Sequence, residues 1–158
     1  MIKIVAVGKI KEKAYKDIIE EYLKRLKPYS KIEIIEVNDE VCNASNSEGD
    51  NIIVKKKEGE RILSKIKDND YVVLLDLWGE QVDSIKLANK INNIYTYNNS
   101  NITFVIAGSL GYSDEVISRA NYKFKLSDLT FTHQMVRVLL IEQIYRCYKI
   151  LGNEIYHK

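Results

Sequence analysis

Short apolar runs alternate along this chain with longer stretches in which apolar residues recur every three or four positions. The runs are rich in β-branched residues and bounded by turn residues, as buried strands are. The five predicted strands span residues 3–7, 31–37, 71–77, 102–108 and 122–126. Helical spacing fills the intervals between them, which predicts an α/β fold: a mostly parallel sheet flanked by helices on both faces.

Capping and stop residues mark the first four predicted helices. Pro28 ends the first helix, and the second follows Gly59. Asp83 or Ser84 opens the third helix, and Ser113 caps a short fourth one. Side-chain oxygens at such positions accept hydrogen bonds from the free N–H groups of the first helical turn.

The last helix is the longest, and an arginine stands at the head of its apolar ridge. It spans residues 133–151 and is closed by Gly152. At about 100° per residue, Arg137 lies on the same side as Ile141 and Ile144. The other side is expected to be a solvated face formed by Glu142, Arg146 and Lys149. Because an unpaired buried guanidinium is very costly, Arg137 should reach a carboxylate, carbonyl groups or a phosphate, or border a cleft. The alternative is a buried stem whose head group lies in solvent.

His133 occupies the first turn of the same helix. The helix dipole disfavours an imidazolium there, so we expect a neutral ring near pH 7. A surface or capping histidine is the simpler interpretation. The helix is also apolar around more of its circumference than one sheet can cover, so a second subunit is the natural cover and a buried central helix the alternative.

The length of 158 residues, without a composition shift or linker that divides it, indicates one domain, residues 1–158. Within it, the polar stretch 38–51 is expected to be a mobile loop. The apolar start is too short for a signal peptide or a membrane span, which predicts a cytoplasmic protein without membrane contact. Cys42 and Cys147 lack the spacing of a disulfide scaffold or a metal site, so no metal is expected.

The net charge of +2, from 24 basic and 22 acidic residues, is too weak to hold nucleic acid by charge alone. If RNA is the partner, shape and a second subunit must contribute. The glycine-rich signatures GxGxxG and GxxxxGK are absent, which disfavours NAD, FAD or ATP binding through them. A ligand should nevertheless lie beyond the carboxyl ends of the strands, near residues 7–9, 75–80, 107–111 and 126–131.

Several segments together resemble the RlmH family, small SPOUT-class methyltransferases that modify a pseudouridine of 23S ribosomal RNA. The specific segments are FVIAGSLG, LSDLTFTHQMVRVLLIEQIYRCYKI and the terminal YHK. VGKIKEKAYKDIIEEYLKRLKPY, KEGERIL and LDLWGE extend the likeness over nearly the whole chain. The resemblance implies S-adenosyl-L-methionine as methyl donor, a homodimer, action on N3 of a pseudouridine within the assembled ribosome, and a C-terminal trefoil knot.

The resemblance also implies site residues. Cofactor binding falls on Leu75, Ala107, Gly108, Leu126, Ser127, Asp128, Leu129, Thr130 and Phe131. The RNA-binding residues are Tyr156, His157 and Lys158, contributed by the partner subunit. His133 is the candidate general base, with Glu142 behind it, and Arg137 is the candidate contact to a phosphate or a uracil carbonyl. We expect Arg137→Ala to fold and bind cofactor yet lose most turnover.

Three positions depart from the family pattern, and two other functions compete. Ala107 replaces a glycine, Thr132 replaces a proline, and Glu80 replaces a residue that is typically basic. The competing functions are a knotted methyltransferase acting on tRNA or another RNA, and a dimeric α/β binding module without chemistry.

Overall fold

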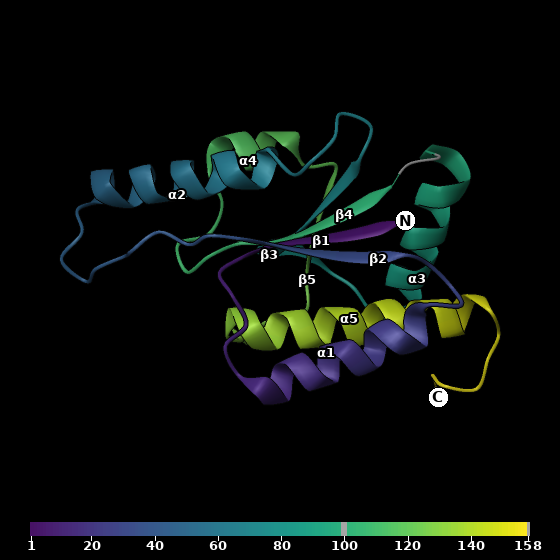
Figure 1. Cartoon of the computed structure of the whole chain (residues 1–158). Coiled ribbons are helices and arrows are strands. Elements are labelled where there is room, and N and C mark those ends of the chain that lie inside the picture. The colour runs from purple at the N-terminus through teal and green to yellow at the C-terminus, as the bar shows by residue number, and fades with distance from the viewer. Residues whose placement is uncertain (99–100, 158) are drawn as a thin grey trace.

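The computed structural model describes residues 1–98 and 101–157, and its centre is one five-stranded sheet (Figure 1). The strands are β1 (Ile2–Val7), β2 (Ile32–Val37), β3 (Tyr71–Gln81), β4 (Ile102–Ile106) and β5 (Tyr122–Lys125). Their order is β2-β1-β4-β3-β5, and every neighbouring pair is parallel. The predicted parallel α/β architecture is therefore confirmed.

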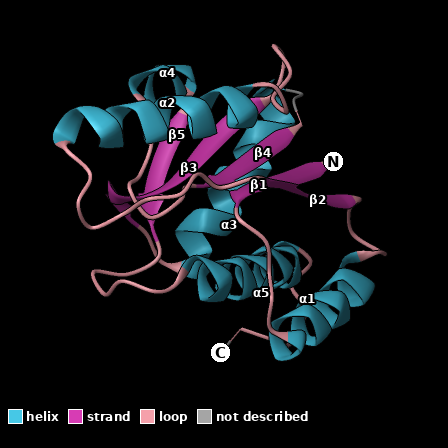
Figure 2. Ribbon diagram, turned by 60° about the vertical axis from the view of Figure 1, so that its left-hand side comes forward, coloured by secondary structure: helices cyan, strands magenta, loops and turns pink. Residues whose placement is uncertain are grey.

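Helices cover both faces of the sheet (Figure 2). They are α1 (Lys13–Leu26), α2 (Glu48–Leu63), α3 (Ser84–Asn93), α4 (Asp114–Arg119) and α5 (His133–Leu151), and α3 continues as the π-helix η1 (Ile94–Asn98). α1, α3 and α5 lie on one face, and α2 and α4 lie on the other. The bounds of α5 match the prediction.

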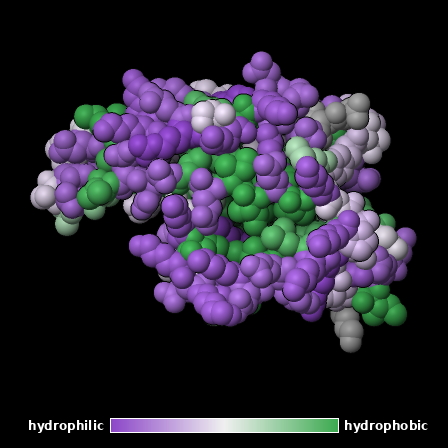
Figure 3. Space-filling model, viewed as in Figure 1, coloured by the Kyte–Doolittle hydropathy of each residue, from purple (hydrophilic) through white to green (hydrophobic). Residues whose placement is uncertain are grey.

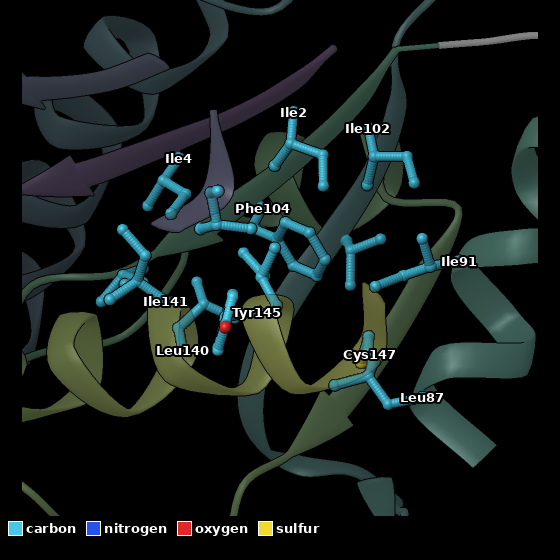
Figure 4. Close-up of a cluster of buried hydrophobic side chains, with 14 of the residues drawn as sticks. Ile2, Ile4, Leu87, Ile91, Ile102, Phe104, Leu140, Ile141, Tyr145 and Cys147 are labelled. Carbon is cyan, nitrogen blue, oxygen red and sulfur yellow. The ribbon is translucent and has the colours of Figure 1, made fainter. Parts of the chain in front are cut away.

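The alternation of side chains along each strand divides the core into two layers. Ile2 and Ile4 of β1 point toward α5, where they meet Leu140 and Ile141 (Figure 4). Val5, the next residue along the strand, faces α2 and α4 instead. Because strand side chains alternate between the faces, a strand buried on both sides reads as one continuous apolar run.

The expected start of α2 was wrong. Ser47 and Asp50 form a capping box, so the helix begins at Glu48, inside the stretch expected to be a loop. Gly59 lies inside the helix. A Cβ at this position would collide with Ser113, the N-cap residue of α4. This glycine therefore permits close helix packing and does not mark a helix start. The polar composition before residue 52 concealed the cap.

β3 is longer than predicted because its tip bulges. Leu75 and Glu80 both pair with Phe124 of β5, so residues 76–79 leave the regular ladder. A Cβ on Gly79 would stand 2.6 Å from the Phe124 backbone, so only glycine allows the returning strand to lie this close. The bulge places Trp78 in solvent, 91% exposed.

Candidate active site

Arg137 is buried beneath the carboxyl ends of β1 and β2. Its NH1 donates to Glu36 Oε1 at 2.7 Å, and its NH2 donates to the carbonyls of Val7 at 2.9 Å and Gly8 at 2.6 Å. The side chain is 0% exposed. The prediction that it reaches a carboxylate and carbonyl groups is confirmed, and a head group in solvent is excluded.

This burial changes the expected role of Arg137. A guanidinium without exposed surface has no face with which to contact a phosphate or a uracil carbonyl directly. Burial lowers the pKa of Arg137, while the charge and hydrogen bond of Glu36 raise it. The charge is therefore held in place by its partners, as expected for a group that positions its neighbours.

His133 stands above this pair, one helical turn earlier. Arg137 NH2 lies 3.3 Å from His133 Nδ1, and arginine can only donate. Of the two neutral tautomers, this contact favours the one with the lone pair on Nδ1 and the hydrogen on Nε2. Partial burial lowers the pKa of His133, and the Arg137 charge lowers it further. The neutral ring agrees with the sequence expectation, although the imidazole itself is exposed on its other side.

Gly8 provides the surface on which the His133 ring rests. Its φ is +84°, and a Cβ there would lie 3.2 Å from His133 Cε1. Its N–H donates to Val37 O at 2.8 Å, which joins the tips of β1 and β2. Both the backbone conformation and the lack of space require glycine here.

The predicted cofactor segments at β3 and β4 are joined by a tyrosine. The Tyr112 hydroxyl lies 2.7 Å from both Leu75 O and Val105 O. Burial raises the pKa of Tyr112, so the phenol remains a donor. Gly108 forms a bridge with Gly111, which closes the turn after β4. The tips carrying Leu75 and Gly108 are thus fixed side by side.

The third predicted cofactor segment runs from β5 into α5. Leu126 and Ser127 are half-buried, whereas Asp128, Leu129, Thr130 and Phe131 are exposed. Ser127 Oγ accepts the N–H of Leu129 at 3.0 Å, and Lys125 pairs with Asp128. Because this segment leads directly into α5, its conformation sets the position of His133.

The three departures from the family pattern have local explanations. Thr132 caps α5, because its Oγ1 accepts the N–H of Met135 at 3.3 Å. The methyl group of Ala107 packs against the core layer beneath α2. Glu80 forms an ion pair with Lys86.

The predicted RNA-binding tail folds back along α5, and Lys158 lies outside the described residues. Tyr156 is half-buried, and its hydroxyl donates to Glu142 Oε1 at 3.1 Å. His157 Nδ1 lies 3.4 Å from Arg146 Nη1. Glu142 and Arg146 are nine and 13 residues beyond His133, roughly 13 and 20 Å along the helix, which separates these two tail side chains from His133 within one chain.

The tail also corrects two expectations about α5. Glu142, Arg146 and Lys149 were expected to form a solvated face, but each is half-buried. Glu142 is paired with Arg146 and is covered by Tyr156. It is nine residues beyond His133, roughly 13 Å along the helix, so it does not back the imidazole of its own chain.

The sequence interpretation missed two of the residues that hold the predicted ones in place, Glu36 and Tyr112, and it included Gly8 only as part of the strand tip 7–9. Glu36, Gly8 and Tyr112 are the partners of Arg137, His133 and the strand tips. Glu36 left one signal, a carboxylate one residue before the end of a predicted strand. Tyr112 resembles an ordinary core residue.

Other chemistry finds little support within the described residues. No group of three or more histidine, cysteine, aspartate or glutamate residues there could hold a metal ion. Cys147 is buried, which raises the pKa of its thiol to about 12. The helices of residues 1–98 and 101–157 include none that is long and apolar enough to cross a membrane.

Comparison with known proteins gives the class that this fold and site define. A family model described as "Predicted SPOUT methyltransferase" matches residues 1–157, and the chain belongs to this family of methyltransferases. The particular relatives are proteins named ribosomal RNA large subunit methyltransferase H. Those of Clostridium perfringens strain 13, Clostridium novyi and Clostridium tetani are each 52% identical over 157 residues, covering 99% of both chains.

Among solved structures, the chain has a weaker likeness to a tRNA methyltransferase from Aquifex aeolicus. The TM-score is 0.49 at 16% identity, covering 92% of this chain and 69% of the other.

Proposed function

We propose that this chain transfers a methyl group from S-adenosyl-L-methionine to N3 of a pseudouridine in 23S ribosomal RNA, at position 1915. The observation that carries the proposal is 52% identity along the full length of relatives named for ribosomal RNA methylation. An enzyme of this kind works in the cytoplasm, on the assembled ribosome. The family resemblance adds a C-terminal trefoil knot to the proposal.

The residues at the strand tips fit such a donor. The turns at Leu75, Gly108 and residues 126–131 lie at the carboxyl ends of three neighbouring strands, β3, β4 and β5. Around Gly111 nothing lies within 4 Å of the position a Cβ would take, so the turn borders open space. Half-buried Leu75 and Leu126 would cover the faces of the adenine, while main-chain groups meet its edge.

When bound, S-adenosyl-L-methionine would supply a sulfonium methyl group: its carbon–sulfur bond breaks, the methyl group bonds to N3 of the uracil ring, S-adenosylhomocysteine leaves, and the N3 proton passes to solvent water. In the tautomer with its hydrogen on Nε2, His133 would suit donation to a uracil carbonyl better than removal of the N3 proton. Arg137 is a positioning residue, since its hydrogen bonds fix the orientation of the imidazole. The chain thereby holds the two reactants aligned, which makes a bimolecular step effectively unimolecular.

A homodimer completes this site in the proposal. Tyr156 and His157 are too far from His133 to act in the same site of one chain, so they serve the partner's site. Exposed apolar side chains on the two loops at the β3 and β5 tips offer an interface; they are Leu77, Trp78, Leu129 and Phe131. The net charge of +2 leaves the ribosome to supply further binding surface.

The test is incubation of purified protein and methyl-labelled donor with ribosomes from a strain that lacks the modification. Nuclease mapping should place the label at one pseudouridine of 23S RNA. Label in tRNA, or at another ribosomal position, would favour the competing RNA substrates. If calorimetry detects no heat with S-adenosyl-L-methionine, the chain is a binding module without this chemistry.

A further inference from the structure

Glu58 is a buried carboxylate that lies against the Gly108 turn. It is on α2 and is 4% exposed. Its Oε1 accepts the N–H of Glu40 at 2.9 Å. Its Oε2 stands 2.6 Å from the position that a Cβ on Gly108 would occupy. A Cβ on Gly108 would therefore displace the end of the Glu58 side chain, so the carboxylate lies directly against a turn of the proposed donor site.

No cation of the described chain neutralises Glu58. Within residues 1–98 and 101–157, no lysine or arginine forms an ion pair with it, and Oε2 receives no hydrogen bond. Arg61, the cation that acts on it from a distance, is engaged by Glu40 and by Asn38 O. Burial raises the pKa of Glu58, and the nearby Asp39 and Glu40 charges raise it further.

A purely structural role does not account for the charge. Glu58 does tie the loop after β2 to α2, but a glutamine carbonyl would accept the same N–H from Glu40. Keeping a buried carboxylate unpaired costs stability, while a neutral side chain of equal size would not. The charge therefore indicates a partner that arrives from outside the chain.

The position of Glu58 indicates which partner this is. Glu58 lies against Gly108, a turn of the proposed donor site, so a ligand held by that turn comes close to its carboxylate. The methionyl part of S-adenosyl-L-methionine carries two cationic groups, the sulfonium and the α-ammonium, and one α-carboxylate, whereas its adenosine part is uncharged.

We propose that the Glu58 carboxylate is the counter-charge for the cationic methionyl part of the methyl donor. This inference rests on the proposed function and adds a donor-binding residue to it. Pairing with the ligand supplies the neutralisation that the chain lacks. It also makes the protein less stable without its ligand than a glutamine variant would be.

The test compares Glu58→Gln with Glu60→Gln, which removes one charge from the exposed side of the same helix. Titration calorimetry is run with S-adenosyl-L-methionine, with S-adenosylhomocysteine, which lacks the sulfonium, and with 5′-methylthioadenosine, which lacks both cations. Glu58→Gln should weaken binding of the donor by at least about tenfold and leave methylthioadenosine unchanged. Glu60→Gln should bind all three like the original protein.

The pattern across the ligands decides the inference. If the variant binds only S-adenosyl-L-methionine more weakly, Glu58 pairs with the sulfonium. If it binds both S-adenosyl-L-methionine and S-adenosylhomocysteine more weakly, Glu58 pairs with the ammonium. Equal losses for all three ligands, or no loss, would overturn the inference. Urea unfolding adds a second readout: Glu58→Gln should be at least as stable as the original protein, and a clear loss of stability would make Glu58 structural. If the unaltered protein binds no donor, the proposed function fails and this inference with it.

Discussion

Replacing Arg137 by alanine should destabilise the fold by about 3–5 kcal/mol, the usual cost of breaking a buried ion pair. The guanidinium makes three short hydrogen bonds, to Glu36, Val7 and Gly8, at 2.7, 2.9 and 2.6 Å, besides its 3.3 Å contact with His133 Nδ1. At roughly 1.5–3 kcal/mol each for a charged donor, their gross value is about 5–9 kcal/mol. The desolvation of the guanidinium offsets part of this, and Glu36, whose side chain is 34% exposed, regains water.

Urea unfolding followed by circular dichroism measures this loss, with Glu36→Gln as the partner variant. Glu36→Gln should cost less, about 1–2 kcal/mol, because Arg137 keeps its two carbonyl acceptors. The double variant should cost less than the sum of the two single variants. A loss below about 1 kcal/mol for Arg137→Ala would refute the reasoning that these bonds hold the tips of β1 and β2 together. The expectation that this variant folds normally is thereby revised, so turnover must be compared per folded molecule.

Three further predictions follow from the same contacts. Gly79→Ala should cost at least about 2 kcal/mol in thermal or urea unfolding, because its methyl group meets the Phe124 backbone, whereas Gly49→Ala on an open helix surface should cost nothing. Tyr112→Phe should cost about 1–3 kcal/mol and weaken donor binding in calorimetry, because two strand-tip carbonyls lose their buried donor. The lowered pKa of His133 means that the unfolded chain binds more protons just below pH 6.5, so stability should fall as the pH falls from there through the folded-state pKa. His133→Gln should flatten this dependence in unfolding experiments at a series of pH values, and an unchanged slope would contradict the assignment.

Local patterns in the sequence predicted much of this molecule. The strand order along the chain, the parallel sheet and the full extent of α5 followed from periodicity and capping residues. The sequence also predicted that Arg137 needs partners, because it lies on the apolar ridge of α5 and a buried unpaired guanidinium is very costly. The start of α2 was not predicted, because the polar residues of its capping box resemble a loop in the sequence.

The sequence by itself determined which side chains need partners, and the tertiary structure decided which partners they have. Arg137 meets Glu36 across 101 positions of sequence, and the Tyr112 hydroxyl meets Leu75 O across 37. These meetings depend on the sheet order β2-β1-β4-β3-β5, in which strands remote in sequence lie side by side. The periods of helices and strands relate only residues a few positions apart. The contact of the Glu58 carboxylate with the Gly108 turn, and the separation of the C-terminal tail from His133, are therefore seen only in the tertiary structure.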